Sequence, residues 1–339
     1  MNGGVYLQTN DAERNEVAAF RRGEDGRLER LGRFATGGRG TGVPHLTSQG
    51  SIVLTRDGAH LLVANAGSDD VSLFAVRDDG LALLACEGSG GLAPTSVAEH
   101  DGVVYVLNAG AANVTGFRIQ NDRLMPIEGS TRDLSAPRAD PAQVGFSPDG
   151  TTLVVTERGT DRIVTYGVNH DGMLGNAAPH ASSGPTPYGF AFSGERTLVV
   201  TEAFGAQVGK AAASSYRLEN GVVTARTRSL GNGRSEICWA VVSHDDRHAY
   251  TTNFADGAVS RYAIAPDGTI ELEDAAAGTT VEGRPGLRDE DVTPDGRYLY
   301  AVDTDAQRVF GWAVGGDGAL EPLGSWDGLP ATVAGLAAR

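Results

Sequence analysis

The chain has 339 residues, with 28 Lys and Arg against 43 Asp and Glu, so its formal net charge is −15. An acidic chain lacks the electrostatic footprint of nucleic-acid-binding proteins and is repelled by anionic membranes, so we expect neither partner. No window approaches the 18 consecutive apolar residues of a transmembrane helix. The two cysteines cannot form a disulfide framework and the first residues do not resemble a secretory signal, so we expect a cytoplasmic protein.

A pattern of short apolar segments repeats along the chain. In each repeat an apolar strand leads into an Asp-Gly type turn, a second strand ends in Asn, Glu or Asp, and a third strand of the type Val-x-x-Phe or Val-x-x-Tyr precedes a weaker fourth. In chain order, first strands are predicted to begin near residues 52, 96, 144, 190, 239 and 291, second strands to span 5–10, 61–65, 104–108, 153–157, 198–202, 249–253 and 299–303, and third strands to span 17–20, 71–76, 114–119, 163–168, 214–218, 259–264 and 309–314.

Four strands in each repeat of 44 to 51 residues are typical of a β-propeller blade. The first repeat lacks its first strand, and residues 328–335 near the C-terminus resemble the segment that begins the third repeat. We therefore predict an all-β, seven-bladed propeller in one domain, 1–339, closed by a C-terminal strand in the N-terminal blade. Residues 11–22 and 203–215 could instead form helices, but the repeat requires strands there and helix propensity is a weak guide.

A propeller brings the loops that lead into its first strands and the ends of its second strands to one face. Acids and amides that end second strands include Glu157, Glu202, Asn253 and Asp303. The incoming loops carry His45, Arg138, Asp140, Tyr188, Glu236, Trp239, Arg288 and Glu290. We expect these residues to form a polar ring around the channel that binds a small molecule.

Simpler alternatives exist for several of these residues. Asn and Asp at strand ends often cap turns, which is the alternative for residues such as Asn253. The run 288–291 could be a solvated charged segment. No organic cofactor is expected. The oxygen-rich ring is compatible with a Ca²⁺ or Mg²⁺ ion, although the nearby arginines oppose one, and we predict no metal ligands.

Segments 62–71, 146–150 and 292–300 resemble the lactonase family of seven-bladed propellers, which contains 6-phosphogluconolactonase-like hydrolases of carbohydrate metabolism and carboxymuconate-lactonizing cycloisomerases. The resemblance implies that Glu202 and Arg288 match two polar residues of the family site. Ala142 stands where the family has a histidine, and Tyr188 stands where it has an arginine. These replacements argue against a phosphorylated lactone, because phosphate recognition usually uses clustered Arg or Lys.

The leading hypothesis is therefore a lactonase-like enzyme that hydrolyses, closes or rearranges a small carboxylate-bearing ring. Glu202 would be the general acid or base, with Glu157 as a second candidate, and His45 and Tyr188 would donate protons. Arg288 and Arg138 would hold the substrate carboxylate or stabilise an oxyanion. The alternative is a non-catalytic propeller that binds a small molecule or a protein partner on the same face.

Overall fold

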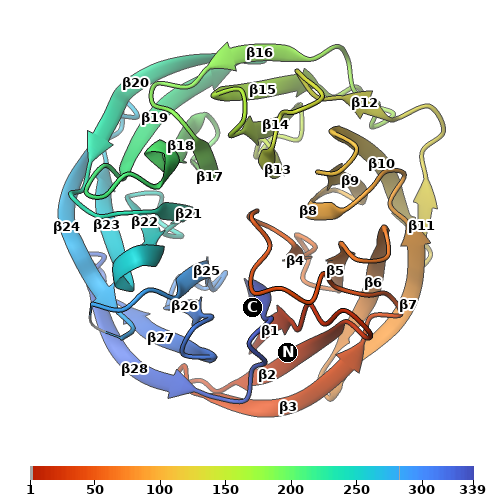
Figure 1. The fold of residues 1–339 in the computed structure, drawn as a ribbon, viewed down its shortest axis with the longest axis horizontal. Helices are drawn as coiled ribbons and strands as arrows, with labels where there is room; N and C mark the ends of the chain where they lie inside the picture. The colour runs from red at the N-terminus through yellow and green to blue at the C-terminus, as the bar shows by residue number, and fades with distance from the viewer. Residues whose placement is uncertain (1–2, 282) are drawn as a thin grey trace.

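Seven antiparallel β-sheets surround a central axis in the computed structural model, which describes residues 3–281 and 283–339 (Figure 1). In six of the sheets the strands follow one another in chain order from the axis outward, and in the seventh the last strand of the chain takes the innermost place; we call these sheets blades 1 to 7. Short apolar strands separated by Asp-Gly type turns favour hairpins between successive strands, which produces this order. The predicted seven-bladed propeller is confirmed.

The blades contain 29 strands among the described residues. Blade 1 consists of β1 (Gly3–Gln8), β2 (Glu16–Arg22), β3 (Leu28–Ala35) and β29 (Ala334–Ala338), blade 2 of β4 (Ile52–Leu54), β5 (His60–Asn65), β6 (Asp70–Arg77) and β7 (Gly80–Gly88), and blade 3 of β8 (Pro94–His100), β9 (Val103–Asn108), β10 (Asn113–Gln120), β11 (Arg123–Pro126) and the short β12 (Arg132–Asp133). Blade 4 consists of β13 (Pro141–Phe146), β14 (Thr152–Glu157), β15 (Arg162–Gly167) and β16 (Ala178–Ala181), and blade 5 of β17 (Pro187–Ser193), β18 (Thr197–Glu202), β19 (Ala212–Glu219) and β20 (Val222–Gly231). Blade 6 consists of β21 (Ile237–Val242), β22 (His248–Asn253), β23 (Ala258–Ile264) and β24 (Ile270–Thr279), and blade 7 of β25 (Leu287–Val292), β26 (Tyr298–Asp303), β27 (Arg308–Val314) and β28 (Leu320–Trp326).

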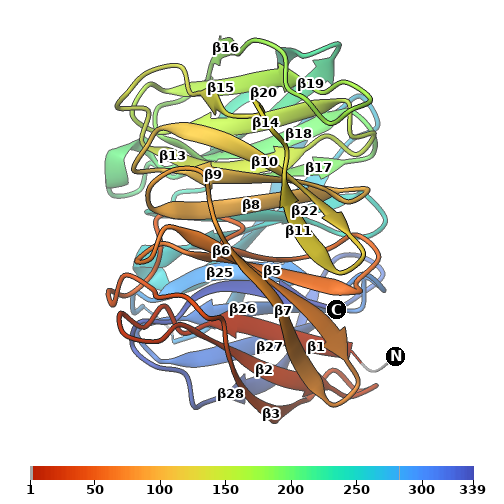
Figure 2. The same ribbon diagram turned by 90° about the vertical axis from the view of Figure 1, so that its right-hand side faces the viewer.

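The two ends of the chain share blade 1, as predicted. β29 pairs antiparallel with β1, so that Val5 lies opposite Ala338 and Gln8 lies opposite Ala334. The start of β1 and the C-terminal end of the chain accordingly lie on the same side of the molecule in the edge-on view (Figure 2). The closing strand begins only at Ala334, near the end of the predicted segment 328–335, because the chain first makes a turn in which the Val333 amide bonds the Pro330 carbonyl at 3.2 Å.

Helical structure is confined to two short 3₁₀ turns, η1 (Phe204–Ala206) and η2 (Phe254–Asp256), in the part of the chain that the structure describes. Residues 11–22 contribute β2, and residues 203–215 contain η1 and the start of β19, so the repeat overrides local helix propensity in both segments. No helix within 3–281 or 283–339 is both long enough and apolar enough to cross a bilayer.

The hydrophobic core lies between neighbouring blades. Between blades 1 and 2, for example, fully buried Val17, Leu61 and Phe74 pack in one cluster. Each such side chain contributes about 1.5–3 kcal/mol through burial. Tyrosines on second strands also reach the neighbouring blade: the Tyr300 hydroxyl donates to the Gly26 carbonyl at 2.5 Å. Equivalent bonds join Tyr105 to Gly172 and Tyr250 to Gly318, each at 2.8 Å.

The recurrent aspartate of the first turn has a local role. The Thr55 hydroxyl donates to Asp57 at 2.7 Å, and the Ser147 hydroxyl donates to Asp149 at 2.6 Å. These bonds hold the pKa of both carboxyl groups below the ordinary value, because they favour the ionised form. The repeated Ser/Thr-x-Asp pattern is thus a turn-stabilising device, and it does not belong to the site.

Candidate functional site

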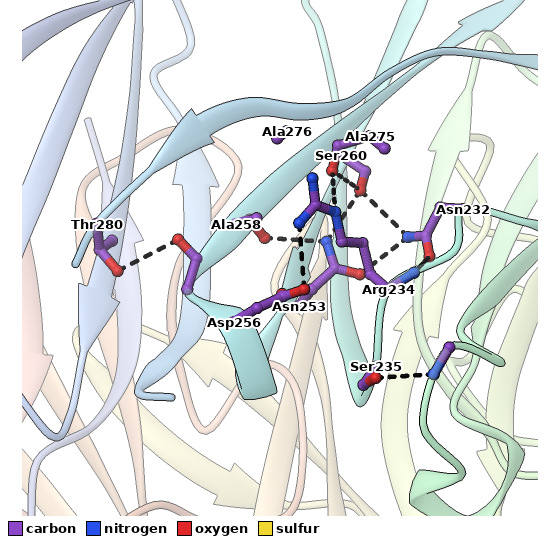
Figure 3. A network of polar contacts seen from close by, with 12 residues as sticks. Asn232, Arg234, Ser235, Asn253, Asp256, Ala258, Ser260, Ala275, Ala276 and Thr280 are labelled. Carbon is purple, nitrogen blue, oxygen red and sulfur yellow. Dashed lines mark hydrogen bonds and ion pairs between the residues drawn. The ribbon is translucent and has the colours of Figure 1, made fainter. Parts of the chain in front are cut away.

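Asn253 and Asp303, which end second strands, bond to their own blades and to the loops that enter these blades, and they do not line the cavity inside the ring. Asn253 ends β22, and its amide nitrogen donates to the Ser260 hydroxyl at 2.9 Å while its oxygen accepts from Asn232 at 2.9 Å (Figure 3). Asp303 ends β26 and accepts from the Thr280 hydroxyl at 2.7 Å. Asn232 and Thr280 belong to loops that enter the same blades. The expectation that Asn253 and Asp303 converge on the channel is therefore wrong, and the capping alternative describes them.

Glu157 and Glu202 occupy the same repeat position and are fully buried. Glu157 accepts bonds from the Ser135 amide at 2.8 Å and the Thr160 hydroxyl at 2.6 Å. The Glu202 carboxylate has five hydrogen-bond donors, which are Ser182, Gly184, Ser214, Tyr216 and Ser229. Glutamate replaces asparagine here because these loops offer hydroxyl and amide donors that a carboxylate can accept. The structure thus places both glutamates inside their blades, which corrects the predicted position at the channel.

The innermost strands of blades 3 to 7 are instead irregular where they begin, and in β8 the register with the second strand shifts between Pro94 and Ser96. In blades 4 to 7 the shifts lie between Pro141 and Gln143, Pro187 and Phe190, Ile237 and Ala240, and Leu287 and Glu290. Such bulges turn side chains that a regular strand would point elsewhere. They gather Ala142, Tyr188, Cys238 and Trp239 in one buried cluster.

Threonines on the second strands compensate for the bulges. The hydroxyl of Thr156 donates to the Tyr188 carbonyl at 2.5 Å, and that of Thr201 donates to the Cys238 carbonyl at 2.6 Å. The backbone groups that leave the regular ladder are thereby satisfied, as buried polar groups require. The threonine that precedes each glutamate in the repeat therefore supports the site from behind.

The loop between β3 and β4 extends into the middle of the ring (Figure 1). Gln49 connects this loop to three blades. Its side-chain nitrogen donates to the Ala240 carbonyl at 2.8 Å. Its backbone N–H donates to the Ala142 carbonyl at 2.9 Å, and its backbone carbonyl accepts from the Ser96 hydroxyl at 2.5 Å. We call residues 45–50 the plug. Sequence reasoning missed Gln49, because nothing in the repeat marks it.

His45 begins the plug and lies against the bulge cluster. Its Nε2 is 3.1 Å from the Tyr188 hydroxyl, and its ring meets that of Trp239 edge-on at 6.1 Å between centroids. Both His45 and Tyr188 are 6% exposed. The His45 backbone has a φ of 64°, a left-handed conformation that costs of order 1 kcal/mol and often marks functional positions.

Two arginines surround this pair. The Arg158 guanidinium stands over the Tyr188 ring at 5.0 Å, and that of Arg288 stands over Phe254 at 3.8 Å. Burial, followed by the charges of Arg288 and Arg158, holds the pKa of His45 well below its usual range. Burial raises the pKa of Tyr188 well above its ordinary value. At neutral pH the site thus has an uncharged imidazole, a protonated phenol and two cations.

The other predicted residues of the incoming loops lie away from the His45–Tyr188 pair, either at the protein surface or along the channel. Arg138 and Asp140 are exposed, and Asp140 pairs with Arg158 at 2.6 Å, which fixes that guanidinium over Tyr188. Glu236 is half-buried in the loop before β21. Glu290 is 3% exposed and is one of the residues that line a cavity of about 680 Å³, as is Trp239.

No cluster of histidine, cysteine or acidic side chains suited to a metal ion occurs among the described residues. The expectation that the face is oxygen-rich fails for a structural reason: its acids and amides are used inside the blades. The face that remains is formed by His45, Tyr188, Trp239, Arg158 and Arg288. Sequence reasoning gave Arg158 no role of its own, although its position next to Glu157 at a departure from the repeat was a usable signal.

The model of the seven-bladed β-propeller lactonase family matches residues 12–137, 126–204 and 199–331 of the chain. The chain belongs to the lactonase family. It is similar to a provisionally assigned 6-phosphogluconolactonase of Bacteroides uniformis (19% identity, 98% of each chain, TM-score 0.77) and to the periplasmic gluconolactonase of Pseudomonas aeruginosa (17% identity, 100% of this chain and 99% of that chain, TM-score 0.74). An uncharacterised protein of Staphylococcus epidermidis is 24% identical over 315 residues, which are 89% of this chain and 76% of the relative.

The lactonase-family resemblance singled out positions 142, 188, 202 and 288, and the structure separates them. Ala142 and Tyr188 share the bulge cluster, and Arg288 lies close enough for its charge to act on Tyr188. Glu202 lies apart from them, in the interior of blade 5. Ala142 stands where the resemblance led us to expect a histidine. In this member of the lactonase family an imidazole is nevertheless present next to Tyr188, because His45 of the plug supplies it.

Proposed function

We propose that this protein is a lactonase-type enzyme that opens or closes a small oxygenated ring bearing a carboxylate. The reaction takes place at the face where the plug meets the bulge cluster. The observation that carries the proposal is the pairing of an uncharged His45 with the Tyr188 hydroxyl beside two guanidinium groups. A binding site for an anion and a proton-transfer pair are the two parts that such a reaction needs.

In the ring-opening direction, Arg288 binds the substrate carboxylate and Arg158 stabilises the negative charge that develops on the carbonyl oxygen. Water adds to the carbonyl carbon as the bond between that carbon and the ring oxygen breaks. The Tyr188–His45 pair takes up one proton from the water and returns one to the ring oxygen, so the pair ends in its starting state. Because the same steps run in reverse during ring closure, the proposal covers both directions.

The test is acid release from a panel of γ- and δ-lactones with and without a carboxylate group. Removing one half of the proton-transfer pair in Tyr188→Phe or His45→Asn should lower kcat/KM by about 10²–10⁴. Arg162→Gln, at an exposed arginine of β15, is the matched control and should retain full activity. Thermal unfolding of each variant shows that the protein is folded.

A second candidate is a non-catalytic carboxylate-binding propeller. The observation in its favour is the depth of the pair, since His45 and Tyr188 are each only 6% exposed beneath the plug. This candidate predicts no acid release from any lactone. It also predicts saturable binding of hydroxy acids that is lost in Arg288→Gln. Unchanged turnover in both Tyr188→Phe and His45→Asn would refute the proposed catalytic pair.

A further inference from the structure

The two arginines of the proposed site are held by neighbouring loop residues in different ways. Arg158 follows β14 and Thr304 follows β26, so they occupy equivalent positions of the repeat. In each blade the N–H of this residue donates to the residue that precedes the innermost strand. Arg158 donates to the Asp140 carbonyl at 3.1 Å, and Thr304 donates to the Gly286 carbonyl at 2.8 Å. On this common backbone frame, blade 4 holds its arginine with an acid and blade 7 holds its arginine with a hydroxyl group.

Asp140 bonds two nitrogens of the Arg158 guanidinium. Nη2 donates to Oδ1 of Asp140 at 2.6 Å, and Nε donates to the Asp140 carbonyl oxygen at 3.3 Å. This double bond from one residue restricts the rotation of the guanidinium over the Tyr188 ring. The Asp140 side chain is 62% exposed and that of Arg158 is 12% exposed, so the acid lies on the outer side of the arginine. An ion pair this exposed contributes little to stability, and its effect is expected in the placement of Arg158.

Arg288 is held by uncharged groups. Its Nε donates to the Thr304 hydroxyl at 3.2 Å, and its guanidinium lies 3.8 Å from the centroid of the Phe254 ring. Thr304 is only 2% exposed, which fixes the position of its hydroxyl. The adjacent Asp289 carboxyl accepts from the Gly335 amide, and burial raises its pKa to about 7, so it offsets the Arg288 charge only in part. Arg288 therefore keeps positive charge that an anion can use.

These two supports suit different stages of the reaction. A guanidinium has five N–H donors, so an acid on one edge of Arg158 leaves donors for a substrate oxygen. The carbonyl oxygen of a lactone becomes negative only in the transition state, whereas a substrate carboxylate is charged throughout. An interaction made only in the transition state changes kcat, and one made equally in both states changes KM.

We propose that Asp140 and Thr304 are positioning residues that give the two arginines different roles, an assignment that rests on the proposed function. Asp140 places Arg158 for the developing oxyanion and so controls kcat. Thr304 places Arg288 for the substrate carboxylate and so controls KM.

The kinetic test compares γ-butyrolactone-γ-carboxylate with neutral γ-butyrolactone. Asp140→Asn removes the charge and keeps a residue that tolerates the left-handed φ of 44° at this position. Misplacement of Arg158 should lower kcat about 10- to 100-fold for both lactones, with KM within about twofold. Asp101→Asn is the matched control, since Asp101 is an exposed aspartate with a φ of 48° in the turn between β8 and β9. It should leave both constants unchanged.

Thr304→Val keeps the shape of the side chain and removes the hydroxyl that bonds Arg288. We expect KM for the carboxylate-bearing lactone to rise about three- to tenfold, with kcat nearly unchanged. The constants for neutral γ-butyrolactone should not move. Phe254→Leu, which removes the ring beneath Arg288, gives the same test if Thr304→Val folds poorly. Thermal unfolding of each variant shows which proteins are folded.

A double-mutant cycle separates positioning from a general structural role. If Asp140 acts through Arg158, Asp140→Asn should cause no further loss of kcat in an Arg158→Gln protein. A further loss of the same size in that protein would overturn the role of Asp140. Lowered kcat with unchanged KM in both Thr304→Val and Phe254→Leu would overturn the role of Thr304.

Binding measurements distinguish failure of these roles from failure of the proposed function. Turnover by the unaltered chain together with the wrong split between kcat and KM would overturn the positioning roles alone. Absence of turnover would overturn the proposed function and the role of Asp140. The role of Thr304 is then decided by isothermal titration calorimetry with γ-butyrolactone-γ-carboxylate. Weaker binding in Thr304→Val but not in Asp140→Asn would support it, and equal affinities or no saturable binding would overturn it.

Discussion

At the scale of single residues, the same repeat position serves one structural purpose in several blades. Asn253, Glu202 and Asp303 each fix the loop that enters a blade against the strands of that blade. Glutamate stands at this position where many hydroxyl and N–H groups can donate hydrogen bonds to a carboxylate, as around Glu202. Departures from a repeat therefore do not by themselves indicate catalysis, because local donor supply can explain them.

Glu202→Gln is expected to destabilise the protein more than it affects chemistry. The variant loses charge-assisted bonds and places an amide donor among hydroxyl and amide donors in a fully buried setting. We expect a loss of about 2–4 kcal/mol in the free energy of unfolding, measured by urea denaturation. Turnover per folded molecule should stay within a few-fold of the unaltered protein. A stable variant without turnover would return Glu202 to the mechanism.

At the scale of elements, closure of the ring depends on five residues that are far in sequence from their partners. β29 supplies the innermost strand of blade 1, and its Ala338 amide also bonds Asp291 of blade 7. Fully buried Val333 and nearly buried Leu336 join the cluster between these two blades. The strand thus closes both a sheet and a core.

Removal of residues 334–339 is expected to open the ring. The edge of β1 would then present unpaired amides and carbonyls, and an exposed edge of this kind promotes association between chains. Size-exclusion chromatography with light scattering should show oligomers or aggregates, and the cooperative thermal transition should be lowered or lost. A truncated chain with the oligomeric state and thermal midpoint of the full chain would contradict this role of β29.

At the scale of the whole molecule, the ring encloses two chemically different regions separated by the plug. One face has uncharged His45 between two arginines, and the cavity on the other side has three acids of β25. Burial raises the pKa of Asp289 and of Asp291 to about 7. The Arg288 charge and the amides of Gly335, Ala338 and Val292 offset this burial only in part.

The stability of the molecule should accordingly depend on pH in a defined direction. Because the folded state holds the protons of Asp289 and Asp291 more tightly than the unfolded state, their stabilising contribution is complete below about pH 4 and is lost as pH rises through about 7. His45 acts in the opposite direction, since its lowered pKa favours folding as pH rises through its unfolded value of about 6.5.

Comparison with Asp289→Asn/Asp291→Asn isolates the effect of the acids. Between pH 5.5 and 8.5 the unaltered protein should lose more than about 1 kcal/mol of unfolding free energy relative to this double variant. Urea denaturation at several pH values measures the difference. Parallel pH profiles for the two proteins would show that the acids do not titrate in this range.

The amino-acid sequence by itself determined the seven blades, the order of their strands and the sharing of blade 1 by both termini, because strand periodicity and Asp-Gly turns are local signals that recur in every repeat. It also indicated His45, Tyr188 and Arg288. Only the tertiary structure decided which of the candidates meet. Contacts between residues far apart in the chain produce the bulges at Tyr188 and Trp239, the path of the plug through Gln49 and the bonding of Glu202 inside blade 5. Such contacts leave no periodic trace in the sequence.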